Sequence, residues 1–122
     1  MRLLIIALLA TVVRGSVTFY SPGVMDRVYL NRLAWGHVQP CERCIGMIAV
    51  VEPGQVGKVA YLTRPGQAPE GPFLIIDTAA DKDRARLQRR GLVAEVDYQT
   101  ARRWGMSGPV FDVQVFTMEV HR

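Results

Sequence analysis

The sequence predicts a small all-β domain, closed into a barrel and containing little helix. Six short runs rich in β-branched and other apolar residues are separated by breakers that contain Pro or Gly. Two or three brief helical patterns lie between these runs. The whole chain has only 122 residues, without internal repeats or low-complexity tracts. Many short strands in so short a chain are typical of a small β-barrel.

The first half of the chain is expected to supply three strands and one helix. In order, these are strand 17–20, helix 25–33, strand 45–51 and strand 57–63. The turn sequence Ser21-Pro22-Gly23 ends the first strand. The helix follows from helical spacing of Met25, Val28, Tyr29 and Leu33, and residues 36–44 then form a loop. The two later runs are short and are separated by Pro53-Gly54, which favours strands.

The second half is expected to supply three more strands and two short helices. In order, these are strand 72–77, helix 81–90, strand 92–96, helix 98–104 and strand 110–120. Pro and Gly residues fill the connection before the strand at 72–77. The helix at 81–90 begins with acids, continues with bases and ends at Gly91, as the helix dipole favours. The last strand alternates polar and apolar residues from Val110 onward.

The first fifteen residues are expected to be a signal peptide. Arg2 supplies a basic start, and residues 3–13 are apolar except for Thr11. This run is shorter than the roughly 20 residues that a membrane-spanning helix needs, but it suits the core of a secretory signal. Cleavage near Gly15 would leave residues 16–122 as one domain, secreted to the extracellular space or the periplasm. The alternatives are an N-terminal membrane anchor and a buried first strand.

The charge pattern argues against a nucleic-acid partner. The formal net charge is +4, and the expected leader accounts for Arg2 and Arg14. The remaining cluster of bases, at 84–90, follows two acids on the same expected helix and has no interleaved aromatic residues. A solvated helix face explains this pattern better than a single-strand binding groove does.

Three segments, taken in order, carry a family resemblance. The first, residues 15–23, is similar to an opening strand of the form Gly-x-Ala-Thr-aromatic. The second, residues 57–62, is similar to Gly-x-x-Val-x-Val. The third has two parts: residues 73–77 are similar to a Val-x-Val-x-Asp strand, and residues 95–106 to a later segment that contains Asp-Leu-Ser. Together they resemble the double-psi β-barrel superfamily of rare lipoprotein A, barwin and the expansins. The resemblance covers residues 15–120 and implies a six-stranded double-psi barrel that acts on, or binds, peptidoglycan or another polysaccharide.

The chain also departs from this family. Thr78-Ala79-Ala80 replaces the family's Asp-Arg-Gly-Pro, and residues 81–94 intervene before the second aspartate. The lipobox cysteine of rare lipoprotein A is absent, so no lipid anchor is implied. No cofactor is expected, and the domain is expected to be a monomer.

Two aspartates, Asp77 and Asp97, end apolar strands and are the candidate catalytic residues. Asp77 resembles the carboxylate that lytic members of the family use as a general acid and that expansins need. A partly desolvated carboxyl group can protonate a glycosidic oxygen. The alternative is that Asp77 only hydrogen-bonds the turn at 78–80. Asp97 resembles the Asp of the Asp-Leu-Ser segment, and it also stands where the N-cap of helix 98–104 belongs. We expect both carboxylates at one groove.

Three further residues are candidates for binding the substrate: Thr18, Tyr20 and Tyr98. Thr18 and Tyr20 resemble the polar residues that line the family's groove. Strand alternation puts them on one face and Phe19 on the other. Tyr20 is therefore expected to stack on a sugar ring, and Tyr98 lies near the second aspartate in the sequence.

Cys41 and Cys44 are the only cysteines, and we expect a local disulfide between them. A redox-active pair would call for a βαβ pattern, which is lacking here. A zinc site built from these two thiolates and His37 would need a fourth ligand, and there is no second Cys pair. We therefore expect no metal.

The sequence thus predicts a secreted, glycan-directed barrel and leaves three functions open. One is cleavage, as in a peptidoglycan lytic transglycosylase or a glycosidase, with Asp77 as general acid/base. Another is expansin-like binding and loosening of polysaccharide without hydrolysis. The third is a secreted structural domain whose aspartates only cap and brace the chain.

Overall fold

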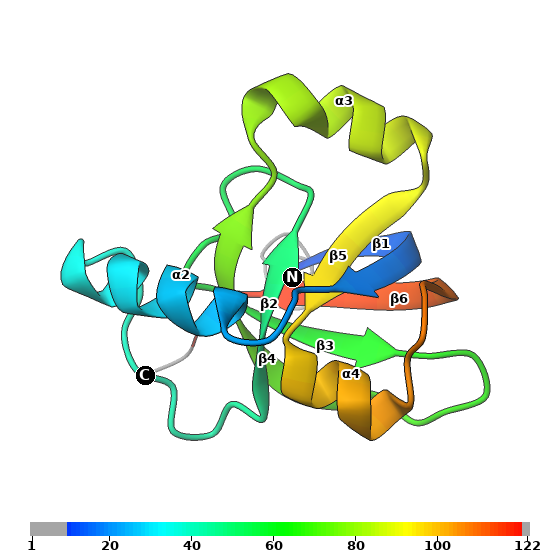
Figure 1. The fold of residues 1–122 in the computed structure, drawn as a ribbon, viewed down its shortest axis with the longest axis horizontal. Coiled ribbons are helices and arrows are strands. Elements are labelled where there is room, and N and C mark those ends of the chain that lie inside the picture. The colour runs from blue at the N-terminus through cyan, green and yellow to red at the C-terminus, as the bar shows by residue number, and fades with distance from the viewer. Residues whose placement is uncertain (1–9, 121–122) are drawn as a thin grey trace, which may run out of the picture.

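The computed structural model describes residues 10–120 and contains the elements that the sequence predicts (Figure 1). These are β1 (Ala10–Phe19), α2 (Val24–Ala34), β2 (Gly46–Val50), β3 (Val59–Thr63), β4 (Glu70–Thr78), α3 (Asp81–Arg89), β5 (Leu92–Val96), α4 (Tyr98–Trp104) and β6 (Val110–Met118). The expected all-β class with a small helical content is therefore confirmed. Among the helices of the described residues, none has the length and hydropathy that crossing a bilayer requires.

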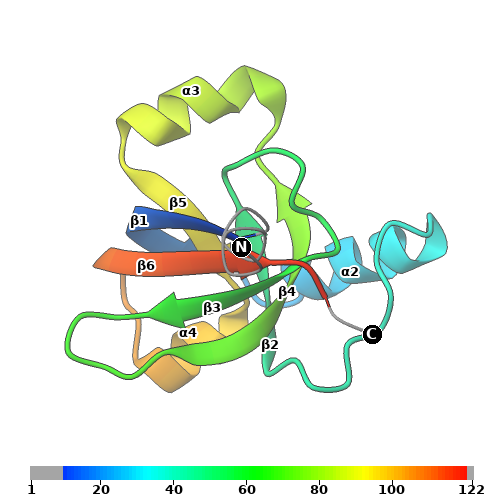
Figure 2. The same ribbon diagram turned by 180° about the vertical axis from the view of Figure 1, so that it is seen from behind.

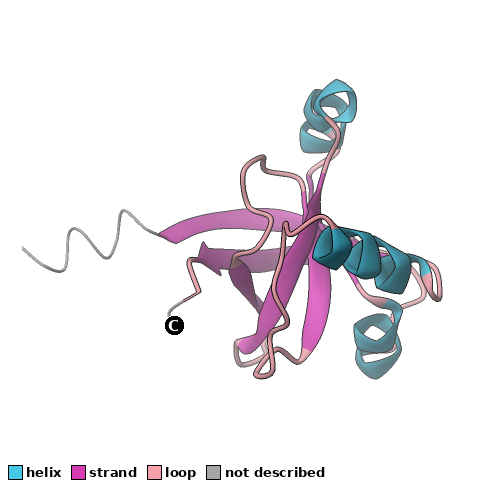
Figure 3. Ribbon diagram, turned by 90° about the vertical axis from the view of Figure 1, so that its left-hand side faces the viewer, coloured by secondary structure: helices cyan, strands magenta, loops and turns pink. Residues whose placement is uncertain are grey.

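The six strands close into one barrel in the order β1-β5-β2-β4-β3-β6. Two neighbouring pairs, β1 with β5 and β2 with β4, are parallel, and the other four are antiparallel. This mixed, closed arrangement is consistent with a double-psi barrel. The three helices lie outside the strands, and a side view places them on one side of the barrel (Figures 2 and 3). Within the described residues each strand therefore has a neighbour on both sides, although residues 10–15 of β1 pair only with β6.

Alternate residues of the strands point inward and form the main core. Its fully buried members include Val17, Ile48, Leu62, Phe73, Ile75, Val96, Val113 and Val115. A smaller apolar cluster lies outside the barrel, between α2, the loop after it and the outer side of β4; Met25, Val38, Leu74 and Ile76 are its buried members. Neighbouring residues of β4 thus alternate between the two clusters, which fixes the register of the strand.

Strand β1 begins six residues before the expected domain boundary at Ser16. Residues 10–15 pair with β6, from Ala10 opposite Met118 to Gly15 opposite Val113, and Val13 packs against the main core. The sequence assigns the apolar pattern of these residues to the leader, because a strand and a signal core look alike in sequence. Residues 1–9 of the expected signal peptide lie outside the described residues, and cleavage near Gly15 stays a prediction.

Candidate functional site

Asp77 lies at the end of β4 and is held by three hydrogen-bond donors. Its Oδ1 accepts from Arg32 Nη2 and from the Thr78 amide, both at 3.0 Å. Its Oδ2 accepts from the Tyr20 hydroxyl at 3.1 Å. The bond to Thr78 agrees with the turn-forming alternative for Asp77. Arg32 and Tyr20 come from α2 and from the chain after β1, so the fold uses distant segments to fix this carboxylate.

Arg32 is in turn held by the way α2 ends. The Gly36 amide donates to Leu33 O at 3.1 Å and the His37 amide donates to Arg32 O at 2.9 Å, the bond pattern of a Schellman turn. Gly36 has φ +75°, which is costly for other residues. The turn brings His37 Nδ1 within 2.9 Å of Arg32 Nη1. Because a guanidinium can only donate, His37 Nδ1 is the acceptor in this hydrogen bond.

A second carboxylate, Glu95, lies across β2 from Asp77. Ala49 of β2 pairs with Asp77 of β4 on one side and with Glu95 of β5 on the other. Two strand spacings put the Cα atoms of Asp77 and Glu95 about 10 Å apart. The neighbours of Ala49, Ile48 and Val50, point into the main core, so Ala49 and both carboxylates occupy the outer face of the barrel. The small side chain of Ala49 leaves the space between them open.

The surroundings of Glu95 favour its protonated form. Burial raises its pKa above the ordinary glutamate value, and the negative charge of Asp77 raises it further, while a hydrogen bond from Thr18 acts in the opposite direction. Burial also raises the pKa of Tyr20, and the charges of Asp77 and Glu95 add to this effect. Tyr20 therefore stays a neutral donor to Asp77. The outer face thus carries an ion-paired carboxylate beside a carboxyl group that holds its proton more tightly.

These groups line a cleft of about 360 Å³ between the outer face of the barrel and α3. Its walls come from Tyr20, just after β1, from β2, β4 and β5, and from α3 with the turn before it. Tyr20, Asp77, Thr78, Asp83 and Glu95 supply its polar side chains, and Ala49, Leu87 and Leu92 are among its apolar ones. An acid, a second carboxylate and an aromatic hydroxyl in one cleft form an arrangement suited to acid–base chemistry on an uncharged polar ligand.

Asp97 has a different position and a structural role. Its Oδ1 accepts from the Thr100 amide at 2.9 Å, as the expected N-cap of α4, and its Oδ2 accepts from the Met47 amide at 2.8 Å. The residue is only 4% exposed, and a Cβ on Gly46 would come within 2.9 Å of its Oδ2. Asp97 lines a hollow with Gly46, Met47 and Gln99, not the cleft of Asp77. The expectation of one shared groove is therefore wrong, because backbone amides of α4 and β2 bind both oxygens of Asp97.

The structure places the three expected binding residues differently. Tyr20 lines the cleft, and Thr18 is the strand partner of Glu95 at its edge. Tyr98 begins α4 and packs on Phe19, with ring centroids 6.3 Å apart, so it does not line the cleft. Sequence reasoning missed Glu95 itself. The available signal was one charged residue in the otherwise apolar run 92–96.

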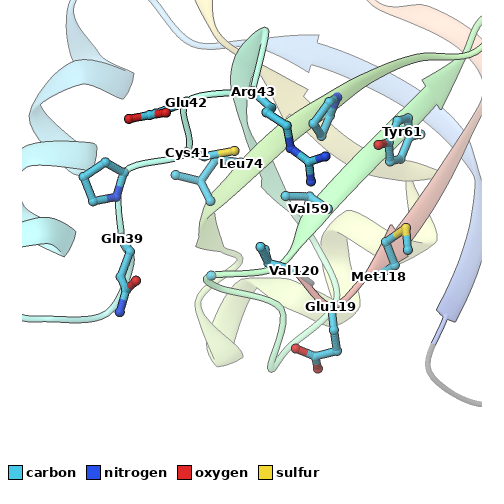
Figure 4. A pocket seen from close by; sticks show the side chains of 13 residues that line it. Gln39, Cys41, Glu42, Arg43, Val59, Tyr61, Leu74, Met118, Glu119 and Val120 are labelled. Carbon is cyan, nitrogen blue, oxygen red and sulfur yellow. The ribbon is translucent and has the colours of Figure 1, made fainter. Parts of the chain in front are cut away.

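Cys41 and Cys44 form the expected disulfide, and both half-cystines pack against the smaller apolar cluster. Within residues 10–120 no group of three or more His, Cys, Asp or Glu side chains is arranged to hold a metal ion. A larger hollow of about 520 Å³ lies beside this disulfide (Figure 4). Val59, Leu74 and Met118 line it together with Glu42, Arg43 and Glu119. Its two carboxylates, Glu42 and Glu119, lie outside the strands, and Glu119 forms an ion pair with Lys58 at 3.5 Å.

Comparisons with protein-family models, with curated proteins and with solved structures find no match to this chain. The fold and the site define a closed six-stranded mixed β-barrel with a carboxylate-lined cleft on its outer face. The function has to be inferred from the chemistry of that cleft.

Proposed function

We propose that the chain is a secreted, glycan-directed domain of the double-psi β-barrel kind, which binds polysaccharide or peptidoglycan in the cleft between α3 and the barrel. One observation carries this proposal: Asp77 and Glu95 flank Ala49 on one face of the sheet. The order of the strands and the family resemblance of residues 15–120 support it. The disulfide agrees with an oxidising compartment.

The two carboxyl groups suit the two halves of glycoside cleavage. Glu95, with its raised pKa, would donate its proton to the glycosidic oxygen as the bond from that oxygen to the anomeric carbon breaks. Asp77 would accept a proton from water that attacks the anomeric carbon, or would stabilise the positive charge that develops there. The inverting mechanism requires carboxyl groups about 6.5–9.5 Å apart, and the side chains of Asp77 and Glu95 extend on one face from Cα atoms about 10 Å apart. Glu95 thereby takes the general-acid role that the sequence suggested for Asp77.

Binding without cleavage is the second candidate, and the bonds of Asp77 favour it. Both oxygens of Asp77 already accept hydrogen bonds, from Arg32, Thr78 and Tyr20. A carboxylate held in this way is fixed in position and can orient a ligand. In this expansin-like reading, the cleft grips a polysaccharide strand, and Glu95 donates a hydrogen bond to it.

The test is to incubate the protein with purified peptidoglycan and with cellulose, and to measure both co-sedimentation and released sugar. Glu95→Gln and Asp77→Asn are compared with Glu42→Gln, which alters an exposed acid outside the cleft. Cleavage predicts release by the wild type and by Glu42→Gln, with losses of about 10²–10⁴ in rate for the two cleft variants. Co-sedimentation without release, weakened by the cleft variants, supports the binding function. Failure of the wild type to bind or cleave either glycan would overturn the proposal.

A further inference from the structure

Trp35 is an exposed aromatic residue at the end of α2. Its side chain is 63% exposed, although large aromatic residues are usually well buried. It is the C-cap residue of the helix, directly before the turn at Gly36. Its other exposed large neighbour on α2 is Leu30, also at 63%.

The turn at Gly36 braces one side of the Trp35 ring. His37 folds back over the helix end, where its ring centroid lies 5.6 Å from that of Trp35 at a tilt of 54°. The same imidazole accepts from Arg32, so its position is fixed by both neighbours. The indole is thus held on one side and free on the other, and it can contact a ligand with little further loss of side-chain freedom.

The bracing residues also connect Trp35 to the cleft. Arg32 binds His37 through Nη1 at 2.9 Å and Asp77 through Nη2 at 3.0 Å. Two side chains, Arg32 and His37, therefore link the carboxylate of Asp77 to the held side of the indole. We propose that Trp35 forms a second sugar-binding subsite that continues the cleft along the end of α2. This inference rests on the proposed glycan function.

The chemistry of this surface selects a sugar ring as the occupant. A pyranose presents an axial C–H face that stacks on an indole, and hydroxyl groups at its rim that need hydrogen bonds. The surroundings of Trp35 supply such partners, since Asn31 is exposed and His37 has its other ring nitrogen available. A protein interface would need a far larger contact area, of the order of 1,000 Å² or more. One braced aromatic residue with polar neighbours, linked through His37 and Arg32 to Asp77 of the cleft, fits a single sugar unit of the same chain.

The experiment measures co-sedimentation of the protein with peptidoglycan and with cellulose over a range of protein concentrations. Trp35→Ala is compared with Leu30→Ala, which removes an equally exposed apolar side chain from the same helix, and with Trp35→Tyr, which keeps an aromatic face. For the glycan that the wild type binds, we expect Trp35→Ala to raise the Kd about tenfold or more. Leu30→Ala and Trp35→Tyr should stay near the wild-type value.

The outcomes separate this inference from the proposed function. Equal binding by the wild type and Trp35→Ala would overturn the subsite and leave the cleft intact. Equal losses for Trp35→Ala and Leu30→Ala would also overturn it, because they would indicate a general apolar surface. A wild type that sediments with neither glycan would overturn the proposed function and the subsite together. Circular dichroism of each variant checks that the fold is kept.

Discussion

Asp77 and Glu95 come from strands that never pair with each other, yet both are register partners of Ala49. The parallel β2–β4 pair and the antiparallel β2–β5 pair bring the two carboxylates to one face, with the smallest chiral side chain between them. Their environments differ. Arg32 forms an ion pair with Asp77, whereas burial and the negative charge of Asp77 raise the pKa of Glu95. Two carboxyl groups with divergent environments are the usual sign of acid and base roles.

Ala49 should control access to the space between the carboxylates. Replacing it by Leu would fill that space, so glycan binding or release should fall at least about tenfold. Crowding at this 8% exposed position should also cost about 1–3 kcal/mol of stability. Ala85→Leu, on the exposed side of α3, is the control for an added apolar side chain. Binding and thermal unfolding of both variants check this, and full activity of Ala49→Leu would remove Ala49 from the site.

Asp97 and Asp77 should separate stability from activity. Asp97→Ala removes the N-cap of α4 and leaves the half-buried Met47 amide without its acceptor, which together should cost about 2–4 kcal/mol. Asp77→Asn keeps the shape of the side chain but loses the ion pair with Arg32, so we expect impaired glycan function in a folded protein. The melting temperature and the glycan binding or release of both variants are measured to test this. An unstable Asp77→Asn and a stable but inactive Asp97→Ala would reverse the two roles.

Glu95 should cost the protein stability at neutral pH. Because its pKa is raised on folding, its stabilising contribution is complete below the ordinary glutamate pKa and is lost as the pH rises through the raised value. Glu95→Gln has no group that ionises here, so its stability does not fall as the pH rises through the raised pKa of Glu95. We expect the variant to melt above the wild type at neutral pH and close to it in acid. Calorimetry at both pH values measures the difference, and a variant that melts lower at neutral pH would argue against the assigned environment.

The first half of β1 should be needed for the barrel. A chain that begins at Ser16 lacks the pairing of residues 10–15 with β6 and the contact of Val13 with the main core. We expect it to melt well below a chain that begins at Ala10, or to lose its cooperative transition. Equal melting temperatures would mean that the barrel does not need residues 10–15. Cleavage of a leader near Gly15 requires this outcome. N-terminal sequencing of the protein recovered from expressing cells and from their medium would show whether a leader is removed and at which residue.

Local patterns were enough to predict most of the fold. Breakers and residue spacing located the strands and helices, and the N-cap position of Asp97 followed from the switch to a helical pattern after residue 97. Glu95 could not be found in this way, since its relation to Asp77 depends on which strands flank β2. Arg32 was missed for a similar reason, because it meets Asp77 across 45 residues of chain. The sequence placed Asp97 in the same groove as Asp77 because the family resemblance concerns the order of motifs along the chain. The cleft depends instead on the register across β4, β2 and β5.

The most direct test of the cleft follows the side-chain carboxyl ¹³C resonances of Asp77 and Glu95 while a soluble oligosaccharide is added. Fragments of peptidoglycan and of cellulose serve as the two probes, and Glu42, outside the cleft, is the internal control. We predict saturable shifts at Asp77 and Glu95 with one of these probes and none at Glu42, whether or not the glycan is cleaved. Unchanged resonances at Asp77 and Glu95 with both probes would contradict a glycan site at this cleft.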